Sequence, residues 1–518
     1  MNTINKFLIF SLILFVGLTA VSAADIIDDD SSAVAVETPQ VDQSYEESFV
    51  QESVQETDNI EEETQTYTGR TYNNPITITP SNYGTQMSNI YSHDAVEFSG
   101  TFTSSMTGGS ISITNPIVFT TTSSATFEDT QFIINSDDVT IKGLTIVNDD
   151  ETDGAAITAI GHDNIEVIGN YISVTKTTYG ETVGIKFNST NNQTICGNTI
   201  VMSVFPQYRW EEIESTPYNI WVFHLNNSAI VVDNSNDVRI KNNNIQSSNS
   251  TITEVNGTNE GMNIRNSNYV NVTYNDVTIN NGDFAYGITF ENVLNSNMTY
   301  NEVEVTAHNY ACGAQLIESK NNIVSYNNFT ATSRNDTTPH NYETVAYGIY
   351  MSTNWGAYNN YNNLISNNKI IVDASVVYGI EGYIVTNITI TGNTIIATGN
   401  CSMGVGLYNS SDIDITNNII TVTGATRTLN SNFYEMITPE TTGIKTMAKE
   451  DTQANYIENN SIFVSDSNVP SDELYAVSLY DDNNYVRHNT LTAGSNTGDG
   501  AVYDDLGSVG SNSISDNH

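Results

Sequence analysis

The chain has 518 residues and a formal net charge of −44, because 60 Asp and Glu face only 16 Lys and Arg. Nucleic-acid binding is excluded as an expectation, since neutralising phosphates requires a basic surface. Anionic pectin-like substrates are disfavoured for the same reason. The three cysteines are an odd number, so we expect no disulfide framework and predict that they are buried in the fold.

Residues 1–24 are typical of an export signal. Lys6 supplies a positive start, residues 7–18 are apolar, and the small residues Val21 to Ala23 form a cleavage site. The alternative is an uncleaved anchor, but the apolar run is short for a membrane span. We therefore expect an extracellular or cell-surface protein with no membrane span after cleavage.

Two segments precede the regular part of the chain. Residues 25–70 hold 14 acidic residues between positions 25 and 63 and no Lys or Arg before Arg70, which predicts a disordered linker. That linker is either a spacer or a solvated pro-segment. Residues 71–125 alternate as β-strands do, at 76–79, 110–113 and 116–122, but do not match the later period. They predict an N-terminal cap with the first imperfect turns.

From 126 to 518 one unit repeats. A small residue, usually Gly, opens an apolar strand, and an Asn follows, most often 14 residues later, as from Gly287 to Asn301. Within this unit Ile288, Phe290, Met298, Val303 and Val305 alternate and face one side. Extra residues collect in the return from Asn to the next Gly. The pattern predicts an all-β solenoid of three short strands per turn and about 13 turns, stacked roughly 4.8 Å apart.

The repeated asparagines occupy one position of the unit. We expect them to take a left-handed backbone at a bend and to bond from turn to turn as a structural ladder. The predicted ladder comprises Asn170, Asn198, Asn243, Asn275, Asn301, Asn327, Asn368, Asn393, Asn418, Asn460 and Asn489.

The motifs ITGNTI (390–395), ITNNII (415–420), VIGNYI (167–172) and ICGNTI (195–200), with YGI at 286–288, 347–349 and 378–380, resemble the right-handed parallel β-helix repeat. That repeat is shared by pectate lyases, polygalacturonases and phage tailspikes. The chain is most similar to adhesin-like proteins of methanogenic archaea. The resemblance implies a right-handed single-stranded parallel β-helix and says little about activity, since one fold hosts many functions.

No catalytic constellation is visible. A hydrolase needs two carboxylates across the sugar bond, and the acidic pairs lie at different phases of the repeat. A lyase needs a base, for which Arg239 and Arg265 are the only candidates on regular turns; both are better explained as solvent-facing structural residues. The histidines have no paired spacing, so we expect no zinc or copper site. We expect no cofactor, and weak calcium binding by loop aspartates stays open.

Aromatic residues concentrate in insertions of the solenoid. Insertions map to one face and often to the binding face, and exposed rings stack on sugars and partners. We therefore predict a ligand-binding surface there, while rings that fold back over the coil are the equal alternative. Its residues are Tyr208, Trp210, Tyr218, Trp221, Trp355, Tyr358 and Tyr361.

These observations predict an adhesin-like cell-surface protein that is not an enzyme. Its partners would be glycans or surface proteins of other cells. The alternative function is a polysaccharide-active enzyme, a glycoside hydrolase or polysaccharide lyase, on the same fold. A third is a purely structural envelope component.

Overall fold

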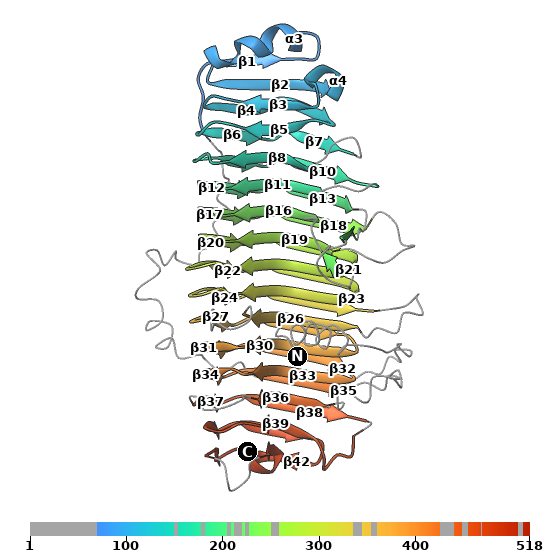
Figure 1. Cartoon of the computed structure of the whole chain (residues 1–518), viewed down its shortest axis with the longest axis vertical. Helices are drawn as coiled ribbons and strands as arrows, with labels where there is room; N and C mark the ends of the chain where they lie inside the picture. The colour runs from blue at the N-terminus through green and yellow to red at the C-terminus, as the bar shows by residue number, and fades with distance from the viewer. Residues whose placement is uncertain are drawn as a thin grey trace.

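A computed structural model describes residues 70–149, 154–177, 182–204, 209–211, 220–222, 227–249, 258–334, 344–353, 360–424, 440–447, 454–467, 469–505 and 511–518. The predicted export signal (1–24) and the linker up to residue 69 lie outside this set. The described chain is a long coil of short strands that runs steadily from its blue to its red end (Figure 1). All pairings within the coil are parallel except one near the C-terminal end. The fold is the predicted right-handed parallel β-helix.

Each turn contributes strands to three walls, seen in Figure 1 as centre, left and right. Wall 1 contains β3 (Ser110–Ile113), β5 (Gln131–Ile134), β8 (Gly154–Ile160), β11 (Thr182–Asn188), β16 (Asn227–Asp233), β19 (Thr258–Arg265), the second halves of β21 (Asp276–Glu291) and β23 (Glu302–Ile317), β26 (Val345–Ser352), β30 (Val376–Tyr383), β33 (Cys401–Tyr408), β36 (Thr441–Met447), β39 (Tyr475–Leu479) and β43 (Val502–Asp504).

Wall 2 contains β1 (Pro75–Ile78), the first halves of β2 (Ala95–Phe102) and β4 (Ile117–Glu128), β6 (Val139–Lys142), β9 (Glu166–Ile168), β12 (Asn191–Cys196), β17 (Asn236–Lys241), β20 (Asn268–Thr273), β22 (Asn297–Thr299), β24 (Ile323–Ser325), β27 (Asn360–Tyr361), β28 (Leu364–Ser366), β31 (Val385–Thr391), β34 (Ser411–Thr416), β37 (Asn455–Glu458), β40 (Asn484–Arg487) and β44 (Ser513–Ser515).

Wall 3 contains the second halves of β2 and β4, β7 (Thr145–Asn148), β10 (Tyr171–Thr175), β13 (Thr199–Val204), β18 (Asn244–Asn249), the first halves of β21 and β23, β25 (Asn328–Ser333), β29 (Lys369–Asp373), β32 (Thr394–Gly399), β35 (Ile419–Gly424), β38 (Ser461–Asp466) and β41 (Thr490–Ala493). The strand β42 (Asn496–Thr497) pairs antiparallel with β41.

One apolar core fills the lumen between the walls. It includes Ile288, Phe290, Met298, Val303 and Val305, all predicted from the repeat to face inward. The core continues into the segment 71–125, where β2 and β4 already pair in parallel with each other. Two short helices, α3 (Tyr83–Gln86) and α4 (Ser104–Thr107), and the 3-10 helix η2 (Met87–Ser92) lie at this end, and η3 (Gly498–Ala501) lies at the other. Among the described residues, no helix has the length and apolar character needed to cross a membrane.

The ladder asparagines form one buried column from Asn170 to Asn489, continued by Asn517. From Asn198 onward, each side-chain oxygen accepts a hydrogen bond from the side-chain amide of the Asn one turn earlier, as Asn327 Oδ1 does from Asn301 Nδ2 at 2.9 Å. The prediction of a left-handed backbone at these asparagines is wrong. The residue just before each one adopts it instead, for example Asn242, Tyr300 and Gly392. An Asn kept out of that conformation can point its amide inward along the stack.

Candidate functional site

The outer face of wall 1 carries a second cluster, separate from the lumen. Strands alternate, so the residues between inward-facing positions point outward. On β21, β23, β26, β30 and β33 at least one outward position of each strand holds a tyrosine. The buried members of this tyrosine cluster are Cys312, Val345, Tyr347, Val376, Tyr378, Cys401 and Met403, with Tyr286, Tyr310, Tyr350 and Tyr408 packed against them. Cys312 and Cys401 are thus buried, as expected, but outside the lumen.

The tyrosines contact one another along the coil axis. The rings of Tyr347 and Tyr378 stack at 5.2 Å between centroids, because Tyr347 and Tyr378 are register partners on adjacent strands. The ring centroids of Tyr310 and Tyr350 each lie 5.2 Å from the ring centroid of Tyr347. Burial raises the pKa of these phenols above the ordinary value, and that of Tyr347 well above it. They are therefore neutral hydrogen-bonding groups at physiological pH.

Glu381 on β30 lies among these rings and keeps partial exposure. Its register partner on β26 is Tyr350, and the Tyr347 side chain hydrogen-bonds to it. Burial raises the pKa of Glu381 to about 8, although the hydrogen bond from Tyr347 acts to lower it. A carboxyl group with such a pKa is protonated at neutral pH and can donate a proton. Perturbed carboxyl groups of this kind are concentrated at functional sites.

A second carboxyl group, Glu260 on β19, lies on the same face. It is 7% exposed and accepts hydrogen bonds from Ser228 Oγ at 2.9 Å and from Asn263 Nδ2 at 2.8 Å. Burial raises its pKa, while the side chains of Thr289, Asn263 and Ser228 act to lower it. The Oδ1 atom of Asn263 is buried without a hydrogen-bond partner among the described residues.

Glu260 and Glu381 are too far apart to act on one glycosidic bond. The register runs from Glu260 through Tyr286, Cys312 and Tyr347 to Tyr378, three residues before Glu381, so four strand spacings of about 4.8 Å separate the two turns. Hydrolytic carboxylate pairs lie roughly 5–10 Å apart. The two groups therefore mark two parts of one surface.

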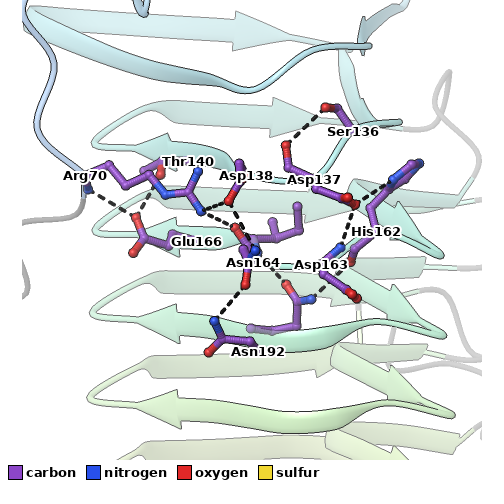
Figure 2. A network of polar contacts seen from close by, with 12 residues as sticks. Arg70, Ser136, Asp137, Asp138, Thr140, His162, Asp163, Asn164, Glu166 and Asn192 are labelled. Atoms are coloured by element: carbon purple, nitrogen blue, oxygen red, sulfur yellow. Dashed lines mark hydrogen bonds and ion pairs between the residues drawn. The ribbon is translucent and has the colours of Figure 1, made fainter.

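A different polar cluster connects the start of the described chain to the coil (Figure 2). Arg70 Nη2 donates to Asp138 at 2.9 Å and to the Asn164 carbonyl at 2.8 Å. Beside it, the Asp163 amide and then the His162 ring bond to Asp137 and lower the pKa of its carboxyl. Among the described residues, no group of three or more His, Cys, Asp or Glu side chains could hold a metal ion. Arg70 therefore fixes the first described residue of the chain to the coil.

The predicted aromatic binding surface falls only partly within the described residues. Trp210 and Trp221 pair in the two-stranded antiparallel hairpin of β14 (Arg209–Glu211) and β15 (Ile220–Val222). Lys320 Nζ lies 5.1 Å from the ring centroid of Tyr361 on β27. The other predicted members, Tyr208, Tyr218, Trp355 and Tyr358, lie outside the described residues. These observations do not bring the hairpin and Tyr361 into one site.

Of the two arginines weighed as lyase bases, Arg265 forms an ion pair with Asp233, 3.1 Å between Nε and Oδ2. The groups that sequence reasoning missed are Glu260, Glu381 and the tyrosine cluster. The signal for the tyrosines was present, since Tyr286, Tyr347 and Tyr378 each precede a repeat glycine. Glu260 and Glu381 each precede a glycine, and only the stacking of the turns reveals their surroundings.

These features define the class of protein: a parallel β-helix with a tyrosine- and glutamate-lined outer wall. No protein-family model and no curated protein matches the chain. Solved structures with this architecture include a periplasmic alginate epimerase, 14% identical over 76% of this chain and 84% of that chain with a TM-score of 0.40. The A-module of an Azotobacter vinelandii mannuronan C-5 epimerase is 12% identical over 81% and 89%, with a TM-score of 0.44. The Dettilon tailspike protein is 13% identical over 82% and 68%, with a TM-score of 0.38.

The comparison corrects one expectation. From the missing catalytic constellation we expected a protein that is not an enzyme, yet the similar structures include epimerases, which are polysaccharide-modifying enzymes.

Proposed function

We propose that this protein is an exported polysaccharide-active enzyme that binds a glycan on the outer face of wall 1. The observation that carries the proposal is Glu381, a carboxyl group with a pKa of about 8 inside an outward-facing tyrosine cluster. Tyrosine rings supply apolar surface for sugar faces, and their hydroxyl groups supply hydrogen bonds. The function stated as the alternative from sequence is thus the one that the geometry supports better.

In this proposal Glu381 acts as the general acid. Its protonated carboxyl group donates a proton to the glycosidic oxygen while a water molecule adds to the anomeric carbon. The C–O bond to the leaving sugar breaks as the bond to water forms, and the second proton of that water passes to solvent. The Tyr347 hydroxyl then stabilises the resulting Glu381 carboxylate by a hydrogen bond. The surrounding phenols remain neutral because burial raises the pKa of each of them. General acid catalysis of this kind contributes roughly 10²–10⁴-fold to a rate.

The test is a panel of polysaccharides incubated with the purified protein, with new reducing ends and unsaturated products measured in parallel. Glu381→Gln should lower the rate at least about 100-fold. The matched control is Glu304→Gln, the same change at an exposed position on wall 3. Wild-type activity should also fall as the pH rises through about 8, where Glu381 loses its proton.

Equal rates in both variants would refute the role of Glu381. Glycan binding with no product from any polysaccharide would refute the enzyme and favour the adhesin-like attachment expected from the sequence.

A further inference from the structure

Next to the tyrosines, wall 1 carries a file of hydrogen-bonding side chains, one on each turn. It consists of Asn263, Thr289, Gln315, Tyr350 and Glu381, which are register partners on consecutive strands from β19 to β30. Thr289 is buried and the other four keep partial exposure. We call this set the polar file. Apolar or aromatic neighbours, Tyr286, Cys312, Tyr347 and Tyr378, run parallel to it on one side.

The spacing of the polar file is that of the fold. Its five positions span four strand separations, about 19 Å in total. A linear polymer whose units repeat at roughly 5 Å, as pyranose rings do, can present one unit to each strand separation of about 4.8 Å. Each unit then lies over one position of the file and the flank of one neighbouring side chain, and the partly exposed members, such as Gln315, Tyr350 and Glu381, can contact it.

The charge on this surface selects among such polymers. On the five strands from β19 to β30, the outward positions of wall 1 hold Glu260, Glu291 and Glu381 and a single cation, Arg265. Arg265 is already paired with Asp233. A uronate polymer carries one carboxylate per sugar and would find no cation along the file. The protonated state that burial favours for Glu381 adds no charge there at neutral pH.

Unused hydrogen-bonding capacity points to hydroxyl-rich units. Asn263 donates its amide group to Glu260, and its Oδ1 atom is buried without a protein partner among the described residues. A buried carbonyl oxygen without a donor is costly. A sugar hydroxyl can donate to it, in a neutral sugar and in a uronate alike, so this oxygen favours a sugar ligand and the charge of the surface selects among sugars. This oxygen lies at one end of the polar file and Glu381 lies at the other.

We infer that the substrate is an uncharged linear glycan that lies along the coil axis, with about five of its sugar units placed on the polar file. The inference rests on the proposed function and adds its substrate class, its direction and its length. It also separates this protein from one that acts on a uronate polymer.

The experiment measures affinity by calorimetry for β-1,4-linked oligomers of glucose, xylose and mannose, from one to seven units, with oligomannuronate as the charged comparison. Affinity for at least one neutral series should rise up to about five units and then level off. It should be insensitive to salt, because no charges meet. Gln315→Ala should weaken binding of the hexamer about tenfold, the effect of one lost hydrogen bond. Gln246→Ala, at an exposed position of wall 3, should leave it unchanged.

Tight, salt-sensitive binding of oligomannuronate that Gln315→Ala weakens would overturn this inference, and the proposed function would stand. An affinity that is already maximal for a disaccharide would overturn the predicted length. Binding equally strong in wild type and Gln315→Ala would place the glycan elsewhere and overturn the polar file. If none of these glycans binds, and no polysaccharide yields product, both proposals fail together.

Discussion

Removing one ladder asparagine tests how the coil is held together. Asn301 Oδ1 accepts from the backbone and side-chain nitrogens of Asn275, both at 3.0 Å. Its Nδ2 donates to the Val272 carbonyl, the Thr299 carbonyl and Asn327 Oδ1, at 2.9, 3.2 and 2.9 Å. Asn301→Ala removes these bonds and leaves the buried Asn275 amide without this acceptor. One orphaned buried donor costs about 1–3 kcal/mol, and each remaining bond contributes about 0.5–1.5 kcal/mol.

We therefore expect Asn301→Ala to lower the free energy of unfolding by at least about 3 kcal/mol, the lower end of the summed contributions. Urea unfolding followed by circular dichroism gives the global effect. Hydrogen exchange of the strands on either side shows whether the loss is local, as in a repeat protein whose turns contact only their neighbours.

The matched control is Asn191→Ala. This exposed Asn bonds to Asp163 from its side chain at 2.9 Å and accepts from Asn236 at 3.2 Å. Water can replace both partners, so the expected loss is below about 1 kcal/mol. Similar losses for the two variants would show that burial of the column is not what makes it stabilising, and the reasoning would be wrong.

Three further predictions follow from other parts of the structure. Gly379→Ala should destabilise the fold by about 1–3 kcal/mol, because the added Cβ would lie 2.2 Å from Ile395 Cγ2. Gly84→Ala is the control and should have no such effect, since a Cβ at that position meets no atom within 4 Å. Thermal melting of the two variants compares them. The pKa of Glu381 is about 8 in the folded state and 4.5 in the unfolded state, so the folded state binds more protons between these values. Wild-type stability should therefore fall, as the pH rises from 4.5 to 8, by up to about 1.4 kcal/mol per pH unit. In Glu381→Gln, urea midpoints across this window should lose that slope, and an unchanged slope would contradict the assignment. Arg70→Gln should lower the free energy of unfolding by less than about 1 kcal/mol at low salt, because the ion pair between Arg70 and Asp138 is partly exposed. Urea unfolding measures this change, and a loss above about 2 kcal/mol would contradict a weak surface ion pair.

Much of the fold could be predicted from the sequence, because a solenoid repeats its local rules. The spacing from Gly287 to Asn301 recurs along the chain, and alternation alone identified Ile288 and Phe290 as inward-facing. The same repeat identified the asparagine position, although not its backbone. The left-handed residue is the one before, which Asn, Gly and even Tyr occupy, so residue type was a poor guide to it.

The candidate site required the tertiary structure. Tyr286, Tyr347, Tyr378 and Glu381 are brought together only by stacking, across returns whose lengths differ from turn to turn. Whether an outward residue is exposed or buried depends on its neighbours above and below, and that burial is what shifts the pKa of Glu381. The sequence by itself determined a coil with a polar-lined bend and an apolar lumen, because these follow from a local period. Only the tertiary structure decided which outward side chains share one low-dielectric surface, because that is a property of contacts between turns.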